Sequence, residues 1–168
     1  MNMAWIDYRK AYDMVPHLWI IECLEMMGVA DNVMEMIQNS MRNWEIILTA
    51  GNTTLGNVKI RRGIFQGDSL SPLIFVMCLI PMTYILRKSE AKYSLGKDSP
   101  SINHLLFMDD LKLFGKSDNE IDTLVRTVHL FSKDIGMEFG VKKCGMVKLK
   151  RGKLNACTDI ELPNGERI

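Results

Sequence analysis

The chain has 168 residues, of which 47% are hydrophobic and 24% charged, and its formal net charge is +1. This length suits one compact domain, and the composition is typical of a globular protein. The most apolar run, residues 73–86, is shorter than the roughly 20 residues of a membrane span. The four cysteines show no metal-ligand spacing, which indicates free thiols. We therefore expect an intracellular protein, nuclear or cytoplasmic, that is neither secreted nor bound to a membrane.

The first 60 residues predict a buried strand, two helices and a pair of strands. The predicted segments are 3–8 (strand), 17–27 and 31–41 (helices), and 44–49 and 58–60 (strands around a turn-rich stretch). The first strand carries Asp7 at its end, and apolar residues at helical spacing mark the first helix, which stops at Gly28. Asp31 is expected to cap the second helix.

The remainder predicts two long helices and a hairpin. The predicted segments are 63–67 (glycine-rich loop), 71–88 (helix), 92–101 (polar loop), 105–107 and 111–114 (hairpin strands), 119–135 (helix) and 141–149 (strand). Pro81 lies inside the first of these helices and is expected to kink it. Strands and helices in this irregular order indicate an α+β fold, with helices packed on one face of an antiparallel sheet.

Three features of the sequence suggest chemistry. Asp7 is an acid at the end of an apolar strand, Asp109 and Asp110 sit in the hairpin turn, and a glycine-rich loop with Gln66 opens a helix. Each has an ordinary explanation, since Asp favours solvated turns and a Gly-rich loop can simply connect two elements. Carboxylates from two strands that meet at one sheet edge would, however, hold divalent metal ions for phosphoryl transfer.

Four segments, in chain order, resemble motifs A to D of the reverse transcriptases of non-LTR retrotransposons and group II introns. They are residues 6–13 with 15–17 (motif A), 62–73 (motif B), 107–110 (motif C, Phe-Met-Asp-Asp), and 136–139 with 143–144 (motif D). The resemblance implies a polymerase palm that carries out RNA-directed DNA synthesis, a nucleotidyl transfer from a dNTP to a primer 3′-hydroxyl. Gly140 stands where the family usually has Asn.

The resemblance also implies roles for individual residues. Asp7 and Asp109 correspond to the acids that bind two catalytic Mg²⁺ ions, with Mn²⁺ as a substitute, and Asp110 supports the same metal site. Lys143 corresponds to the motif D lysine, a candidate general acid for the pyrophosphate leaving group.

The implied substrate-binding residues come from motifs A and B. They are Tyr8, Tyr12, Arg62, Gln66 and Gly67. Tyr12 falls where the family places an aromatic side chain under the sugar, so that a 2′-hydroxyl is excluded. This residue argues against an RNA-dependent RNA polymerase, which needs a smaller or polar side chain there. Gln66 and Gly67 fall where motif B lies against the incoming nucleotide and the template.

The expected partners are an RNA template, a DNA primer and a dNTP. The motifs cover most of residues 1–168, so we interpret the chain as a partial reverse transcriptase domain, a palm whose fingers and thumb segments are missing. We expect the isolated chain to be inactive for that reason. The alternative is a catalytically inactive palm remnant that acts, if at all, as a binding module.

Overall fold

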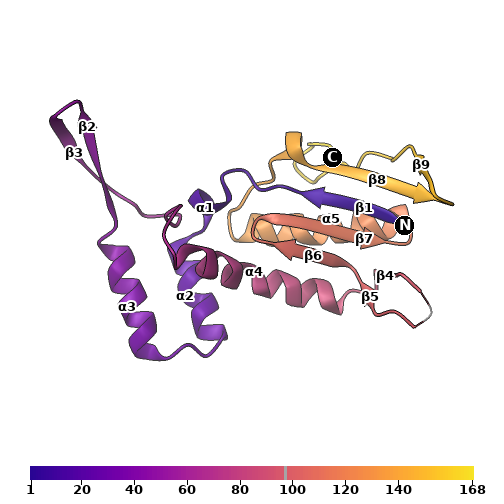
Figure 1. Ribbon diagram of the computed structural model, residues 1–168, viewed down its shortest axis with the longest axis horizontal. Coiled ribbons are helices and arrows are strands. Elements are labelled where there is room, and N and C mark those ends of the chain that lie inside the picture. The colour runs from indigo at the N-terminus through magenta and orange to yellow at the C-terminus, as the bar shows by residue number, and fades with distance from the viewer. Residues whose placement is uncertain (97) are drawn as a thin grey trace. The chain divides into compact units, whose positions relative to one another are not determined.

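The computed structural model describes residues 1–96 and 98–168 (Figure 1). The chain divides into two compact units. Unit 1 comprises Met1–Ala11 and Leu79–Ile168, and unit 2 comprises Tyr12–Cys78. Helix α4 (Ser71–Lys88) begins in unit 2 and ends in unit 1. The helix was predicted with these same bounds, whereas Lys97, inside the predicted polar loop, lies outside the described residues.

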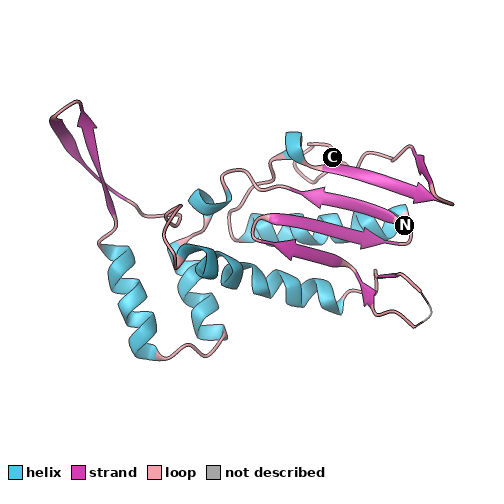
Figure 2. Cartoon of the chain, in the orientation of Figure 1, coloured by secondary structure: helices cyan, strands magenta, loops and turns pink. Residues whose placement is uncertain are grey.

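Unit 1 contains a five-stranded sheet in which every pair of neighbouring strands is antiparallel (Figure 2). Its strands, in spatial order, are β6 (His104–Phe107), β7 (Asp110–Gly115), β1 (Asn2–Ile6), β8 (Gly145–Lys150) and β9 (Lys153–Asn155). The strand predicted from the first apolar run therefore lies at the centre of the sheet. The predicted motif C hairpin is formed by β6 and β7, its neighbours on one side.

One face of this sheet is covered by helix α5 (Asp118–Asp134). Ala4 and Ile6 of β1 are buried, as are Leu111 and Leu113 of β7, while the residues between them face the open side. This period-2 alternation is what an antiparallel sheet with one covered face requires. The apolar stripe of α5 supplies the other side of the core, through Ile121, Leu124, Val125, Val128 and Phe131.

Short elements complete unit 1. Strands β4 (Tyr93–Ser94) and β5 (Ser101–Ile102) form a separate two-stranded sheet. The 3₁₀ turn η1 (Val141–Lys143) precedes β8. Near the C-terminus, Glu161 and Arg167 form an isolated bridge.

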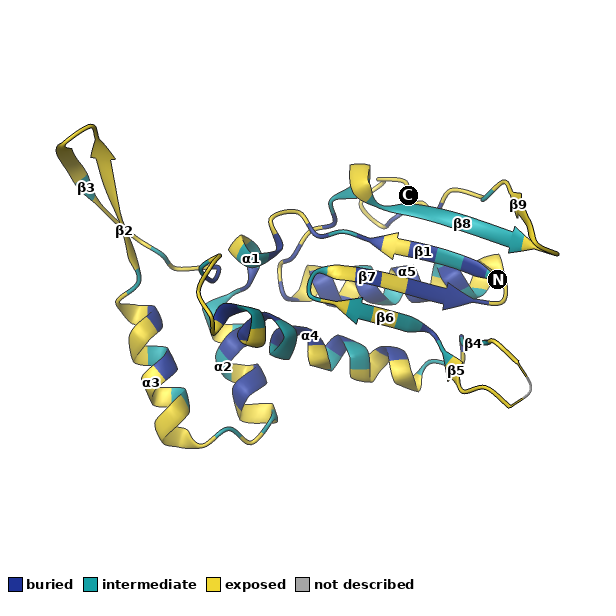
Figure 3. Cartoon of the chain, viewed as in Figure 1, coloured by how far each residue is buried: buried dark blue, intermediate teal, exposed yellow. Residues whose placement is uncertain are grey.

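Unit 2 begins with the short helix α1 (Ala11–Met14), which spans the unit boundary, and continues with helices α2 (His17–Met26) and α3 (Asp31–Arg42). A hairpin of β2 (Glu45–Ala50) and β3 (Thr53–Lys59) follows. Its side chains are exposed at nearly every position, including apolar residues on both faces (Figure 3). A two-stranded hairpin of this kind is marginally stable when nothing packs on it.

Three local predictions were wrong at their boundaries. Strand β3 begins at Thr53, because a tight turn with Gly51 at positive φ replaces the predicted loop. Asp31 lies inside the first turn of α3, and the N-cap residue is Ala30. Residues 141–143 form a 3₁₀ turn instead of strand, because the amide of Lys143 donates to the carbonyl of Gly140.

Helix α4 is long and apolar enough to cross a membrane by length and composition, although 39% of it is buried within the structure. The core helix of a globular protein can have the same length and composition. Within unit 1, its residues Leu79, Met82 and Leu86 are fully buried. The side-chain Nδ2 of Asn103 donates to the carbonyl of Leu86, which ties the C-terminal half of α4 to the segment before β6.

Candidate active site

Strand register places two of the predicted acids side by side in unit 1. The ladder between β1 and β7 ends with the pair Ile6 and Leu111, and the same register continued by one residue sets Asp7 opposite Asp110. Ile6 and Leu111 point into the core, and successive side chains alternate between faces. Asp7 and Asp110 therefore both lie on the open face of the sheet, Asp7 half-buried and Asp110 exposed.

Asp109 sits at the tip of the same hairpin. Phe107 pairs with Asp110, which leaves Met108 and Asp109 as a two-residue turn; Asp110 already belongs to β7. Met108 has φ of 54°, a left-handed conformation that is uncommon without glycine. Such strain costs on the order of 1–3 kcal/mol and clusters at functional sites. The backbone thus holds the acidic turn in a strained and well-defined shape.

The carboxylate of Asp7 is poorly satisfied. Its Oδ2 atom is buried and has no hydrogen-bond partner. The Nζ atom of Lys143 lies 3.4 Å from it, close enough for an ion pair but without hydrogen-bond geometry. The side chain of Lys143 is 75% exposed, so solvent screens the pair and its net worth is about 0–1 kcal/mol. A buried acceptor without a donor destabilises the folded state by roughly 1–3 kcal/mol, which is more than the ion pair contributes to stability.

The backbone of Asp7 is held firmly, in contrast to its side chain. The amide of Gly140 donates to the Asp7 carbonyl at 2.7 Å, and the amide of Asp7 donates to Sγ of Cys144 at 3.4 Å. Burial raises the pKa of the Cys144 thiol, which keeps it protonated. The sequence identified this segment through motif D, but it assigned no role to Cys144 because a thiol contact to a backbone amide has no sequence pattern.

Tyr8 was predicted to bind substrate, and the structure buries its side chain instead. The ring is 3% exposed and packs edge-to-face on Phe139. Its hydroxyl lies 2.9 Å from Oγ of Ser132. Since the Ser132 hydroxyl donates to the carbonyl of Val128, Tyr8 is the donor to Ser132. Burial raises the pKa of Tyr8 to about 12. In this structure the side chain is a core residue, because the alternation of β1 continues two residues beyond the strand and turns Tyr8 to the face opposite that of Asp7.

The motif B loop lies in unit 2, where backbone contacts shape it. Arg62 donates through Nε to the carbonyl of Met14 at 2.7 Å. Gly63 has φ of 86°, and a Cβ placed on it would lie 2.8 Å from the backbone of Asp13. Only glycine fits there, because both the conformation and the close approach exclude a side chain.

The predicted residues Gln66 and Gly67 follow in the exposed part of this loop. Asp68 closes the loop onto α4, since its Oδ2 accepts from the backbone amides of Leu70 and Ser71. This places Gln66 and Gly67 directly before a capped helix N-terminus, a position that favours anions. The sequence had predicted the loop without assigning this role to Asp68.

Tyr12, the predicted sugar-contacting residue, is half-buried in unit 2. Its ring stacks on Phe75 of α4, with the centroids 4.7 Å apart and the planes 8° from parallel. The carbonyl of Tyr12 accepts a hydrogen bond from the amide of Ile64. The ring is therefore held in one orientation by its neighbours within the unit.

A divalent cation fits the donor set on the open face of unit 1. Carboxylate oxygens are the ligands that Mg²⁺ prefers, and it is commonly bound by one or two carboxylates together with substrate phosphates. Across residues 1–96 and 98–168, no three His, Cys, Asp or Glu side chains form a ready-made metal cluster. Asp7, with its unsatisfied oxygen, and the acids of the hairpin match the sparse protein ligation that a substrate-completed site requires.

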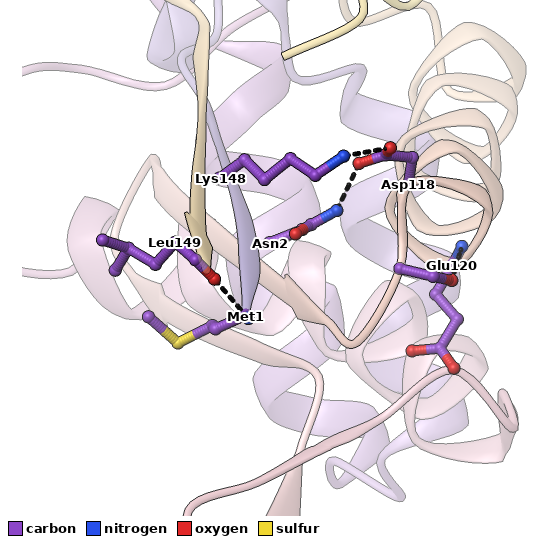
Figure 4. A network of polar contacts seen from close by, with 7 residues as sticks. Met1, Asn2, Asp118, Glu120, Lys148 and Leu149 are labelled. Atoms are coloured by element: carbon purple, nitrogen blue, oxygen red, sulfur yellow. Dashed lines mark hydrogen bonds and ion pairs between the residues drawn. The ribbon is translucent and has the colours of Figure 1, made fainter. Parts of the chain in front are cut away.

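The far end of the sheet carries a polar network that the sequence did not indicate. Asp118, at the start of α5, accepts from the side-chain Nδ2 of Asn2 on β1 and from Nζ of Lys148 on β8 (Figure 4). The N-terminal amine of Met1 donates to the carbonyl of Leu149. These contacts tie the end of β1 opposite Asp7 to helix α5 and to β8, so the network anchors the strand that leads to Asp7.

The antiparallel sheet, with acids on its open face and helix α5 on the other, has the architecture of a polymerase palm. The sequence profile described as reverse transcriptase (RNA-dependent DNA polymerase) matches residues 2–155. The chain belongs to the reverse transcriptase family. It is 27% identical, over 87% of its length, to a Pol polyprotein of the type-1 retrotransposable element R2 of Popillia japonica. It is 26% identical, over 95% of its length, to the Pol polyprotein of the type-2 element R2DM of Drosophila melanogaster. The chain spans 24% and 15% of these relatives.

Solved structures support the same fold. Apo telomerase from Candida tropicalis, truncated at its C-terminal domain, superimposes with a TM-score of 0.70 at 14% identity, covering 90% of this chain and 31% of that one. Telomerase from Candida albicans, in complex with a fragment of telomeric RNA, gives a TM-score of 0.69 at 12% identity, covering 96% of this chain and 28% of that one. At these identities the likeness concerns the fold alone, and it confirms the predicted α+β palm.

Proposed function

We propose that the chain supplies the catalytic palm for RNA-directed DNA synthesis by a retrotransposon polymerase, in which a primer 3′-hydroxyl attacks a dNTP. The observation that carries this proposal is the register that brings Asp7 level with Asp110 on the open sheet face, with Asp109 in the adjoining turn. Strand ends suit such chemistry, because catalysis of phosphoryl transfer is mostly positioning and charge neutralisation.

Asp7, Asp109 and Asp110 would hold two Mg²⁺ ions, or Mn²⁺ in their place. When bound, such ions activate the attacking oxygen and stabilise the leaving one. Asp7 brings a carboxylate whose Oδ2 is already out of water and without a donor. The exposed ammonium of Lys143 lies beside Asp7. We assign Lys143 the role of general acid, which donates a proton to the leaving pyrophosphate.

In unit 2, Gln66, Gly67 and Arg62 are proposed to contact the nucleotide and the RNA template. The capped start of α4 behind the loop supports an anionic ligand there. Tyr12 is proposed to exclude a 2′-hydroxyl, and its stacking on Phe75 gives the rigid ring that this role needs. Replacing Tyr12 by Ala should then increase ribonucleotide incorporation, and unchanged sugar selectivity would remove this role.

The test of the proposed activity is primer extension by the chain fused to matching fingers and thumb segments, on an RNA template with a DNA primer. We expect Mg²⁺-dependent synthesis that Asp7→Asn and Asp109→Asn each abolish. Asp134→Asn, the same change at an exposed position on α5, serves as the matched control and should retain activity. A well-folded fusion that extends no primer would instead favour the inactive palm remnant. An intracellular site of action, in the nucleus or cytoplasm, is part of this proposal.

A further inference from the structure

Lys143 and Asp7 form an ion pair in which the two side chains differ in their exposure to solvent, and this difference affects how a metal could reach the site. The Asp7 side chain is 22% exposed, whereas that of Lys143 is 75% exposed. The ammonium can therefore return to water at little cost, but Oδ2 of Asp7 cannot. A carboxylate oxygen out of water is stabilised by a nearby positive charge, so Asp7 depends on a cationic partner more than Lys143 depends on Asp7.

Gly140 permits this pairing. Its φ of −81° is open to any residue, yet a Cβ at this position would lie 2.8 Å from Oδ2 of Asp7. Any side chain here would force the carboxylate to turn.

We propose that Lys143 is an exchangeable counter-ion, which neutralises Asp7 until a divalent cation arrives and then withdraws, and that Gly140 is the positioning residue that makes room for this pair. The inference rests on the proposed function, since it assumes that Asp7 is a metal ligand. It deepens that function, because withdrawal from Asp7 releases the Lys143 ammonium for the proton transfer assigned to it.

The experiment measures Mn²⁺ affinity of the chain itself by electron paramagnetic resonance, counting only binding lost in Asp7→Asn. Lys143→Gln should bind Mn²⁺ about fivefold more tightly, the size of one exposed ion pair. Lys143→Arg should match the wild type within about twofold, because it keeps the charge. Lys142→Gln is the matched control: it removes the same charge from the neighbouring exposed residue of η1 and should change nothing.

The direction of the effect separates the explanations. Damage to the site would weaken binding, so a gain in Lys143→Gln alone supports exchange. Equal affinities in the wild type and Lys143→Gln, equal gains in both Gln variants, or a loss in Lys143→Gln would overturn it. Absence of any Asp7-dependent binding would overturn the proposed metal site and the exchange together, whereas the other outcomes leave that site standing.

A double-mutant cycle tests Gly140. With Gly140→Ala as the background, Lys143→Gln should change the affinity less than twofold, because the carboxylate has already turned away from the lysine. Gly96→Ala is the control background, since its Cβ would meet only the Ser99 hydroxyl at 3.4 Å, and there the fivefold gain should persist. A fivefold gain in the Gly140→Ala background would show that this glycine does not govern the pair.

Discussion

The two units deliver their motif residues by different physical means. In unit 1, Asp7 and Asp110 are placed by strand register over a core that includes Ile6 and Leu111, both almost fully buried. In unit 2, the motif B loop is shaped by backbone contacts such as the fit of Gly63, while the hairpin β2–β3 stands exposed. A site held by a packed core tolerates substitutions in exposed loops but is sensitive to cavities in that core. A loop shaped by backbone contacts is sensitive to substitutions within the loop and tolerates cavities elsewhere.

The largest expected contrast comes from one substitution made in each unit. Leu113→Ala, at a fully buried position of β7, should destabilise the protein by about 2–5 kcal/mol, because it leaves a cavity under the sheet. Leu55→Ala, at a position of β3 that is 67% exposed, should change stability by no more than about 0.5 kcal/mol. Urea unfolding of both variants measures the difference. Equal losses would mean that the hairpin is packed against something in solution.

Alkaline pH should weaken unit 1 through Tyr8. Its pKa is raised by burial from 10.0 to about 12, so the folded state holds the proton more tightly than the unfolded state. Stability is therefore fully present below pH 10 and falls as pH rises towards 12, by roughly 2–3 kcal/mol in all. Tyr8→Phe should abolish this loss, and Tyr12→Phe in unit 2 should retain it. Identical curves for the wild type and Tyr8→Phe would contradict the assignment.

Two glycines of the motif B loop sharpen the account of unit 2. Gly63 and Gly67 both have positive φ, at 86° and 91°, but only at Gly63 would a Cβ meet other atoms. Gly63→Ala should thus cost about 1–3 kcal/mol more than Gly67→Ala, since the backbone strain is shared and the overpacking is not. Thermal unfolding of the two variants checks this, and equal costs would exclude the close packing on Asp13.

The smallest expected effect lies in the polar network at the far end of the sheet. Asp118 is 49% exposed, so Asp118→Asn should cost about 1 kcal/mol or less. The cost should shrink in high salt, because exposed charges are screened. Asp134→Asn is the comparison, at an exposed position of the same helix. A stability loss above about 2 kcal/mol in Asp118→Asn, unchanged by salt, would mean that the polar network around Asp118 is shielded from solvent.

Sequence periodicity predicted the elements that carry strong patterns. The α4 helix, the apolar stripe of α5 and the strand before Asp7 all have alternating or helical spacing that packing preserves. Boundaries set by single hydrogen bonds were not predictable. The 3₁₀ turn over residues 141–143 depends on the Lys143 amide reaching Gly140, and the start of β3 depends on a two-residue turn at Gly51.

The motif resemblance identified the acids and Lys143, but it could not predict the burial of these residues or the contacts around them. That Asp110 lies level with Asp7 follows from the register between β1 and β7, which sequence does not specify. The resemblance placed Tyr8 among the substrate contacts, whereas the alternation that continues beyond the end of β1 turns its ring into the core. The unsatisfied oxygen of Asp7 and its contact with Gly140 arise between segments more than 130 residues apart, and no local pattern encodes them.

The most direct test of the central claim is a crystal structure of the chain grown with Mn²⁺, in which anomalous scattering locates the metal. We expect the strongest peak on the open face of unit 1, roughly 2.0–2.6 Å from a carboxylate oxygen of Asp7 and within reach of the Asp109–Asp110 turn, with Lys143 withdrawn. The proposed metal site would be contradicted by a crystal saturated with Mn²⁺ that shows no anomalous peak at Asp7. A main anomalous peak beside Asp118, at the far end of the sheet, would contradict it equally.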